Sequence, residues 1–426
     1  MAWWSRLLGR KDATPADADL TTRIFGDMLA GKTTSGVQVT TDTALKQSTA
    51  WACIRVRSED IGKLPCFLYR RVEGGKGREK ATDNPLYRLI AVRPNSRHTP
   101  MEFKAMMQLQ LDTRGNALAV KQFSLRGDVT ALWPVPWKNV TVLTSPDGLE
   151  LFYRVRGQTG EETIFPAEGV IHLRGMSQDG LIGMSPIAYH RETIGLALAA
   201  EQYGAAFFGN NAQPSGVLKV KQVLSKEAIG ALRADWEKRF RGPGNAHSLA
   251  VLDGEMDWTQ IGMDNADAQF IETRAGSTRD ICRIFRVPPH KVGDLANATF
   301  SNIEQQAIEY VTDCLLAEMT RWEETLNRDL LSEDEQGELY FKFLPDALLR
   351  GDLKSRYDAY AIGRNWGWLS ADDVRDKEEM NPLPDDQGSV YLQPLNMVKA
   401  GTLPSPTTAA LPAAGDPNLP PAEAPK

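Results

Sequence analysis

The sequence contains no run of about 18 apolar residues, the minimum for a membrane-spanning helix. Its first residues, Met1 to Lys11, lack the apolar stretch and the small-residue cleavage site of a secretory signal. The four cysteines form no C-x-x-C pair, and each lies among apolar neighbours: Cys53, Cys66, Cys282 and Cys314. We therefore expect no membrane span, structural zinc site or disulfide scaffold, and a reducing compartment fits this cysteine usage.

Positive charge is also scarce. The 426 residues include 49 lysines and arginines against 55 aspartates and glutamates, for a net charge of −6. Proteins that grip nucleic acid over a large surface are usually basic, so any contact with DNA is expected to be weak or confined to a small area. Hydrophobic residues make up 42% of the chain, which is ordinary for a globular protein of about two to four domains.

The histidines and carboxylates form no catalytic or metal-binding pattern. The five histidines show no ligand spacing. His172 precedes Gly175–Gly180, which does not match the G-x-S-x-G turn of nucleophilic serines, so it is interpreted as a histidine at the end of a strand. Adjacent carboxylates such as Asp372 and Asp373 are typical of a solvated helical face. The sequence therefore predicts no enzyme, no cofactor and no metal ion.

One motif supports an alternative function. Gly26–Thr33 matches the phosphate-binding pattern G-x-x-x-x-G-K-[ST], and Leu249–Glu255 resembles an apolar strand that ends in a magnesium-binding acid. A P-loop also requires a buried strand before it and a helix that begins at its lysine. Only Ile24-Phe25 precedes the motif, and poor helix formers follow it. This context favours a chance match, and an NTPase that uses Lys32 remains the alternative.

Hydrophobic periodicity predicts an α+β unit in the N-terminal part of the chain. Helices are expected at Thr43–Lys63, Asn84–Arg93 and Thr99–Thr113. The third begins with a capping box, in which Glu102 follows Thr99 by three residues. Short strands, most of them in antiparallel hairpins, are expected at Leu64–Val72, Ala117–Leu125, Val129–Val135, Val140–Thr144, Leu151–Val155 and Thr163–Phe165.

Two long helices are expected on either side of a small α/β insert, Pro214–Gly262. The first, Pro186–Phe208, is rich in small residues, which let helices or neighbouring subunits approach closely. Tight packing within one subunit is the favoured explanation. The second, Asp267–Phe285, carries arginines for which ion pairs between subunits are favoured over a weak ladder facing phosphates. The small residues of the first helix are Ala188, Gly195, Ala197, Ala199, Ala200, Gly204, Ala205 and Ala206. The arginines in and just after the second helix are Arg274, Arg279, Arg283 and Arg286.

The rest of the chain is expected to be mainly helical. A loop at Gly293–Ser301 leads into a long helix that ends near Leu331 and has one apolar stripe. A strand at Phe341–Phe343 and a helical pair at Asp346–Arg364 and Ser370–Glu379 follow. The tryptophan-containing head at 1–22 is too short to anchor a membrane alone and is interpreted as a docking arm. The proline- and alanine-rich segment 401–426 is expected to be disordered.

Several short segments, in order along the chain, resemble those of phage portal proteins between about Thr43 and Pro394. They match the entry to and exit from the first stem helix, the end of the second stem helix, and the helix that follows the tunnel loop. Asn210-Asn211-Ala212 and Arg286 depart from this pattern, since Asn-Gly and glycine are common at these two places. The matching segments are Gly115-Asn116-Ala117, Ile171–Ile187, Phe207–Leu218, Ile281–Pro289 and Asn302–Gln305.

The resemblance implies the α+β portal fold, with an α/β wing, two stem helices, a small α/β clip insert, a tunnel loop, a long helix and a helical crown. It implies these boundaries: a flexible arm at 1–42, wing at 43–185, first stem helix at 186–209, clip at 210–262, second stem helix at 263–287, tunnel loop at 288–301, long wing/crown helix and strand at 302–345, crown at 346–395 and a disordered tail at 396–426.

The same resemblance implies a structural function: a ring, typically of twelve subunits, at one capsid vertex, through which double-stranded DNA is packaged and ejected. The implied partners are other copies of the chain, transiently bound DNA, the large terminase, a head-to-tail adaptor and the capsid or scaffold protein, with no membrane. The protein would be in the host cytoplasm during assembly and then in the virion. A generic scaffold protein without a DNA role is a further alternative.

The site residues follow from this assignment. The part of the tunnel loop from Gly293 to Ser301 would face DNA without any lysine or arginine, which suits sliding because each phosphate neutralised by a fixed cation adds affinity and drag. Stem-helix packing would use both small and charged residues. The DNA-facing residues are Asp294, Asn297, Ala298, Thr299, Phe300 and Ser301, and the packing residues are Gly195, Ala199, Gly204, Arg274, Arg279 and Arg283.

Overall fold

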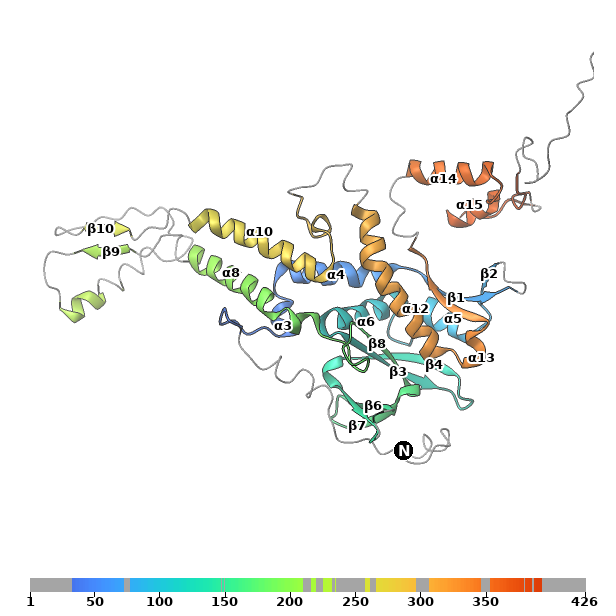
Figure 1. The fold of residues 1–426 in the computed structure, drawn as a ribbon, viewed down its shortest axis with the longest axis horizontal. Helices are drawn as coiled ribbons and strands as arrows, with labels where there is room; N and C mark the ends of the chain where they lie inside the picture. Colours follow the sequence, from blue (N-terminus) through green and yellow to red (C-terminus); the bar gives the residue numbers. More distant parts are fainter. Residues whose placement is uncertain are drawn as a thin grey trace, which may run out of the picture. The chain divides into compact units, whose positions relative to one another are not determined.

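The computed structural model describes residues 33–72, 77–146, 148, 150–209, 216–219, 225–231, 234, 257–260, 266–295, 306–345, 353–378, 380–384 and 387–392. The chain divides into two units, residues 1–349 and 350–426, which are described separately below. Their helices and strands are drawn in Figure 1. The expected disordered tail and the head at 1–22 lie outside the described residues.

Two helices form the centre of the first unit. After the short α3 (Thr41–Ala44), helix α4 (Ser48–Lys63) packs along α6 (Pro100–Arg114). The capping box predicted for α6 is confirmed: Thr99 accepts a hydrogen bond from the backbone of Glu102, whose carboxylate accepts one from Thr99 N. Helix α5 (Pro85–Ala91) begins with the Asn84 side chain as its cap.

Helix α6 ends at Gly115, which takes the left-handed conformation with φ 73°. A Cβ atom there would lie 2.1 Å from the carbonyl oxygen of Met184, so only glycine fits this close crossing of two chain segments. Asn116 links the two segments, since its side-chain amide donates to Gly183 O at 2.7 Å and accepts from Gly183 N at 2.8 Å. The Gly115-Asn116 pair therefore joins the end of α6 to the segment that precedes Pro186.

The described strands of the first unit form four antiparallel sheets. In the three-stranded sheets, the middle strand is β1, β3 or β6. The first has the order β11 (Leu339–Phe343), β1 (Cys66–Arg71), β2 (Arg78–Lys80). The second has the order β4 (Val129–Val135), β3 (Asn116–Phe123), β8 (Val170–Arg174), and the third β5 (Val140–Thr144), β6 (Leu151–Arg156), β7 (Glu162–Pro166). The fourth sheet pairs β9 (Gly216–Lys219) with β10 (Asp257–Gln260).

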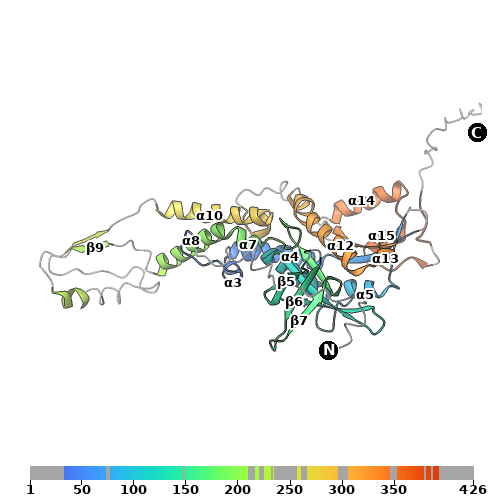
Figure 2. The same ribbon diagram turned by 60° about the horizontal axis from the view of Figure 1, so that its bottom comes forward.

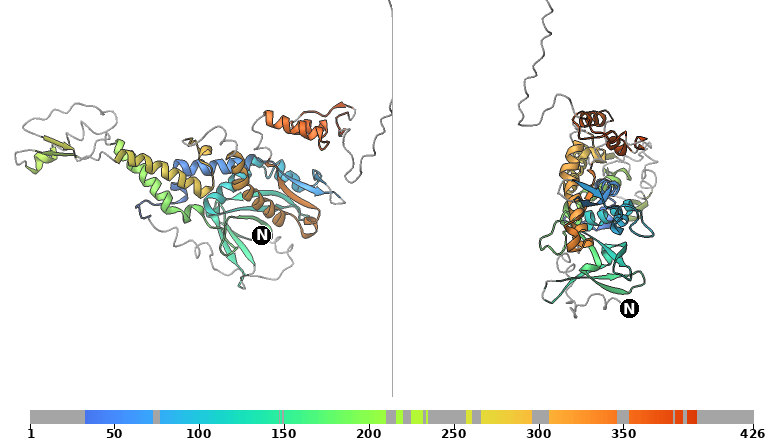
Figure 3. Two further views of the ribbon diagram at one scale, coloured as in Figure 1. Left: turned by 45° about the horizontal axis from the view of Figure 1, so that its top comes forward. Right: turned by 90° about the vertical axis from the view of Figure 1, so that its right-hand side faces the viewer.

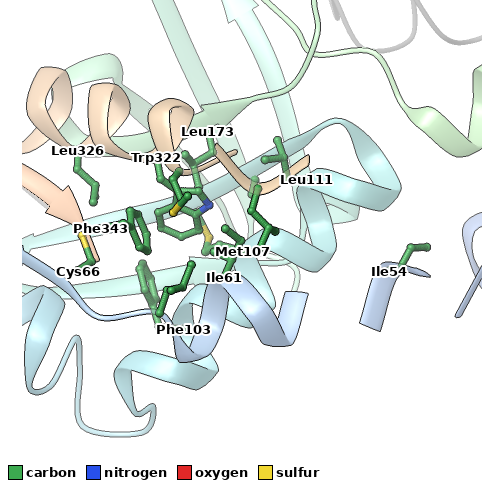
Figure 4. Packing of buried hydrophobic residues seen from close by; sticks show 14 of the residues in the cluster. Ile54, Ile61, Cys66, Phe103, Met107, Leu111, Leu173, Trp322, Leu326 and Phe343 are labelled. Atoms are coloured by element: carbon green, nitrogen blue, oxygen red, sulfur yellow. The ribbon is translucent and has the colours of Figure 1, made fainter. Parts of the chain in front are cut away.

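The main core lies where α4 and α6 meet the amphipathic helix α12 (Leu316–Leu330) and the sheet containing β11 (Figure 4). The Trp322 indole packs edge-on against Phe103 and Phe343, with ring centroids 6.4 Å apart in both pairs. Met107 and Ile61 fill the adjacent space and are fully buried. The apolar stripe predicted for the helix ending near Leu331 is therefore the side that packs on the core.

A smaller core forms beneath the β5–β6–β7 sheet around His172 on β8. The imidazole stacks on Trp137, with ring centroids 5.3 Å apart, and its two nitrogens bond the Tyr153 hydroxyl at 2.9 Å and Asn116 Oδ1 at 3.1 Å. Burial lowers the pKa of His172 well below its usual value, with nearby Arg174 and Arg328 contributing. His172 is thus a neutral packing residue in the middle of β8, and the interpretation that it lies at the end of a strand was wrong, although no catalytic pattern surrounds it among the described residues.

Two predicted helices differ from the structure. The helix expected at Pro186–Phe208 is divided at His190 (φ −105°, ψ 24°) into α7 (Pro186–Tyr189) and α8 (Arg191–Gly209). The two parts have different neighbours, since α7 packs on α6 whereas α8 packs on α10 (Ala266–Phe285). The long helix before Leu331 contains a π-helical turn, Tyr310–Leu315, ahead of α12. A short helix, α13 (Glu333–Gln336), then precedes β11.

The described part of the second unit contains α14 (Leu353–Asn365) and α15 (Ala371–Lys377). The two helices agree with the predicted helical pair, although residues 346–352 of the first lie outside the described part. Helix α15 begins with a capping box between Ser370 and Asp373. Arg356 on α14 donates to the Glu378 carboxylate at the end of α15 at 2.9 Å, which joins the two helices.

Candidate stem helices and channel segment

Helices α8 and α10 lie side by side in all the ribbon views (Figures 1, 2 and 3). The C-terminal half of α10 also packs on α4. There Ile281, Cys282 and Phe285 are buried, and the Cys282 sulfur lies 3.9 Å from that of Cys53 on α4. The two long helices predicted on either side of the insert are therefore a packed pair, and α4 fixes the base of α10.

The small residues of α8 do not share one function. Gly195 is buried against Thr33 of the same chain, and a Cβ atom at Gly195 would lie 2.7 Å from the Thr33 Cγ2 atom. Gly204 is buried as well. Ala199 is half-buried. At Gly195, close packing within one subunit, the explanation favoured from the sequence, is what the structure contains.

One side of α8 remains exposed and apolar. Leu196 is 54% exposed and Tyr203 is 50% exposed. Ala199 lies three residues after Leu196 and four before Tyr203, so the three share one helical face. An exposed apolar face on a helix that packs on its other side suits contact with another molecule. We call Leu196, Ala199 and Tyr203 the outer face of α8.

The arginines of α10 divide between two sides of the helix. Arg279 and Arg283 are four residues apart, share one face and are exposed, whereas Arg286 is exposed just after the helix has ended. Arg274 is also exposed, but its position places it on a different face. Arg283 pairs with Asp280 of the same helix at 2.6 Å. In the single chain, this arginine is thus balanced within its own helix.

Helix α10 ends in a strained turn. Arg286 has φ 55°, the left-handed conformation that side chains other than glycine rarely adopt. This geometry satisfies the end of the helix, since Arg286 N donates to Arg283 O and Val287 N donates to Cys282 O. Position 286, one of the two places at which the sequence departs from the pattern that it resembles, is therefore a left-handed helix cap, and arginine occupies it at an energetic cost.

The segment after α10 leads toward the predicted tunnel loop. A short 3-10 turn, Pro289–Val292, packs near α4 and ends at Gly293, which has φ 87°. Asp294 N donates to Pro289 O at 3.0 Å, and the Leu295 side chain is 60% exposed. The predicted DNA-facing residues after this point lie outside the described part of the chain: Asn297, Ala298, Thr299, Phe300 and Ser301.

A buried ion-pair cluster, which we call the hub, lies directly behind the end of α10. The Arg57 guanidinium on α4 pairs with Asp112 of α6 at 2.8 Å and with Glu318 of α12 at 2.9 Å. Its Nη1 atom also donates to the carbonyl oxygen of Phe285 at 3.0 Å. Gln108 extends the hub by donating to Asp112 and accepting from the Trp322 indole. One arginine thus joins four helices.

The charges of the hub stabilise one another in a nearly dry environment. Burial alone would lower the pKa of Arg57, but the carboxylates of Asp112 and Glu318 hold it well above its usual value. Burial raises the pKa of Asp112 despite the nearby arginine. For Glu318, burial is outweighed by Arg57 and Arg321, which lower its pKa. The hub therefore depends on its arginine remaining in place.

The sequence reasoning missed the hub, although a signal for it existed. Arg57 lies between Ile54 and Ile61 at spacings of three and four residues, within the apolar stripe of its helix. Glu318 occupies the same kind of position between Leu315 and Trp322. A charged residue inside an apolar stripe indicates a buried ion pair, because an unpaired buried charge is very costly.

The alternative NTPase function lacks the geometry that it requires. No helix begins at Thr33, where Thr33 Oγ1 instead bonds Val37 O at 2.7 Å in a turn, and the next helix, α3, begins at Thr41. Lys32 and the strand expected at Leu249–Glu255 lie outside the described residues. Without a helix N-terminus next to the motif, the phosphate cradle of a P-loop is not formed there.

Within the described ranges, no group of three or more histidine, cysteine or acidic side chains is arranged to hold a metal ion. In the same part of the chain, no helix is both long and apolar enough to cross a bilayer. The four cysteines are free thiols and all are buried.

The profile of the family described as "Phage portal protein" matches residues 48–379. The chain therefore belongs to the phage portal protein family. A curated relative, the probable portal protein of Streptomyces phage phiC31, is 33% identical over 424 residues, which cover 95% of this chain and 91% of the relative. The portal protein of Enterobacteria phage HK97 is 29% identical over 389 residues, which cover 90% of each chain.

Solved structures share the fold. A chain from the neck of an empty gene transfer agent particle, computed with C6 symmetry, has a TM-score of 0.56 at 20% identity and covers 87% of this chain and 96% of its own. An HK97-family phage portal protein from Corynebacterium diphtheriae has a TM-score of 0.55 at 18% identity, covering 74% and 98%. Portal proteins form oligomeric rings at the capsid vertex, and the chain has this structural function.

Proposed function

We propose that twelve copies of the chain form a ring in which residues 186–209 and 263–287 are the two stem helices around a channel for double-stranded DNA. The observation that carries the proposal is the packed α8–α10 pair, which is followed directly by the segment that begins at Gly293. Residues 288–301 would then be the tunnel loop. The DNA would pass through the channel during packaging and again during ejection.

The charges of the chain support a conduit that does not hold DNA tightly. The net charge is −6, and the sequence from Gly293 to Ser301 contains one aspartate and no lysine or arginine. Each phosphate neutralised by a fixed cation strengthens binding and slows movement. The hub supports the same function mechanically, since it fixes the end of α10 to α4, α6 and α12 immediately before the channel segment.

The outer face of α8 and the arginines of α10 are proposed as contacts between neighbouring subunits. Residues 210–262 would form the clip, where the head-to-tail adaptor and the large terminase dock. Its described strands support a compact insert, because β9 and β10 pair near the two ends of the segment, with Leu218 opposite Trp258. Residues 43–185 would form the wing that contacts the capsid or scaffold protein. The terminase would supply the ATPase activity, and this chain would not be an enzyme.

Electron microscopy of the purified chain tests the ring, and a loop replacement tests the channel. Particles with rotational symmetry are expected, whereas a strict monomer under all assembly conditions would contradict the ring. Replacing Asp294–Phe300 with a glycine linker of equal length should lower packaged DNA without lowering the number of assembled capsids. The matched control is a glycine replacement in the exposed turn at Leu125–Gly127, for which packaging should not change. Normal packaging with the first replacement would contradict the tunnel-loop assignment.

A further inference from the structure

The second unit has almost no apolar interior. Among its described residues, only Ser370 and two glycines, Gly363 and Gly388, are buried. None of its side chains belongs to either hydrophobic core cluster. Eight large apolar side chains in this short segment are instead exposed: Tyr357, Ile362, Trp366, Trp368, Met380, Val390, Tyr391 and Leu392.

Polar contacts hold this unit together. The Glu378 carboxylate accepts hydrogen bonds from Arg356 at 2.9 Å and from the Tyr360 hydroxyl at 2.8 Å, which fixes the inner side of α14. Asp372 accepts from Leu383 N at 2.9 Å and its own backbone donates to Gly388 O at 3.0 Å. Net hydrogen-bond energies are modest, and exposed apolar side chains gathered in one place mark sites of contact with another molecule. The unit therefore requires a cover for its apolar side chains.

The exposed residues of α14 form two separate edges. With about 3.6 residues per turn, Tyr357 and Ala361 lie on one edge, and Ile362 lies on another that is rotated by roughly 140°. Trp366 comes just after the end of α14 and stays on the Ile362 edge, since its backbone N–H donates to Ile362 O at 3.0 Å. Asp358 and Asn365 are exposed between the two edges and keep them apart. Tyr357, Ile362 and Trp366 are 45%, 50% and 57% exposed. The helix thus presents two apolar surfaces, and on its third side Arg356 and Tyr360 bond the Glu378 carboxylate.

A two-fold dimer would use one patch on both partners, whereas a closed ring uses two different patches on every subunit. Two distinct apolar edges on one helix are what a subunit needs to contact a copy on each side. We propose that the Tyr357/Ala361 edge of one chain packs on the Ile362/Trp366 edge of the next copy around the ring. This inference rests on the ring proposed above and assigns its second unit a head-to-tail contact between subunits.

Hydroxyl-radical footprinting of the full-length chain, read by mass spectrometry, tests whether a second copy covers these edges. The oxidation rates of Tyr357 and Trp366 are expected to fall by about fivefold or more from the monomer to the ring, because side chains central to an interface lose nearly all their water contact. Leu125, which is 98% exposed in a loop of the first unit, is the control and should be oxidised equally in both states.

Each outcome of the footprint is decisive. Rings in which Trp366 is oxidised as fast as in the monomer would overturn the inference and leave the ring itself intact. Protection that is already complete in the monomer would show that the chain's own first unit covers the edges, and would also overturn it. A chain that forms no ring at all would contradict both this inference and the proposed function.

Cross-linking then distinguishes a head-to-tail contact from a two-fold one. Tyr357→Cys and Trp366→Cys chains are mixed and treated with a short bis-maleimide; the four native thiols are buried, so they react slowly. Dimers are expected only when both variants are present, and a chain that carries both substitutions should give a ladder of multimers. Dimers formed by either variant alone would overturn the head-to-tail assignment. Rings that contain both variants and give no cross-linked product would overturn it as well.

Discussion

Replacing Arg57 with methionine is expected to destabilise the first unit strongly, because it removes the cation that two buried carboxylates share. The side chains of Asp112 and Glu318 are only 4% and 11% exposed. Removing one partner of a buried ion pair costs about 3–5 kcal/mol. The carbonyl oxygen of Phe285 also loses its donor at 3.0 Å, which adds about 1 kcal/mol. The expected loss of unfolding free energy at pH 8 is therefore about 5 kcal/mol.

The loss should become smaller in acid. Burial already raises the pKa of Asp112, and without Arg57 only the Gln108 hydrogen bond remains to oppose it, so the folded variant binds a proton more tightly than the unfolded chain does. The loss of unfolding free energy caused by Arg57→Met is therefore complete above the pKa that Asp112 has in the folded variant. It shrinks as the pH falls toward the pKa that Asp112 has in the unfolded chain. In the parent chain, the lowered pKa of Glu318 contributes stability that is lost on acidification. That loss occurs only below the unfolded pKa of about 4.5, so it is the Asp112 effect that brings the two chains closer together at pH 5 than at pH 8.

Urea denaturation followed by circular dichroism measures this difference, at a concentration where the two chains have the same assembly state. Arg55→Met is the matched control, because Arg55 lies on the same helix and its pair with Glu59 is exposed. No measurable change is expected from it. Replacing Arg57, Asp112 and Glu318 together by methionine, leucine and methionine should restore most of the lost stability. The reasoning would be refuted if Arg57→Met lowered the unfolding free energy no more than Arg55→Met does, or by the same amount at pH 5 and pH 8.

Much of the fold could be predicted because it depends on local signals. The Thr99–Glu102 capping box set the start of α6. Alternating apolar residues predicted β4 and β5 with the bounds that the structure has. The ordered segments shared with portal proteins then placed the long helices, and the family assignment is confirmed. The boundaries of wing, stem, clip and crown stay predictions.

The rest could not be predicted because it arises from contacts between distant elements. The break at His190 separates a turn that packs on α6 from a helix that packs on α10, and no helix breaker in the sequence marks it. Asp112 and Glu318 meet Arg57 only after three helices have assembled. The stem-helix packing predicted for Gly195 stays a prediction, and its neighbour in the single chain is Thr33.

Two further changes test the ends and faces of the stem helices. Arg286→Gly should raise the unfolding free energy by about 1 kcal/mol in urea denaturation, since φ 55° is costly for arginine and not for glycine. Arg279→Gly, inside α10, is the control and should lower the unfolding free energy by about 1 kcal/mol. Equal effects of the two substitutions would contradict the strained cap. Tyr203→Glu places a charge on the outer face of α8 and should prevent rings in mass photometry, because a side chain that is 50% exposed in the single chain would be desolvated between subunits. Gln202→Glu, an exposed neighbour about 100° around the helix, introduces the same charge and should leave rings intact. If both variants form rings equally well, the outer face of α8 is solvent-exposed in the assembly, and the contact between stems must use the arginine face of α10 instead.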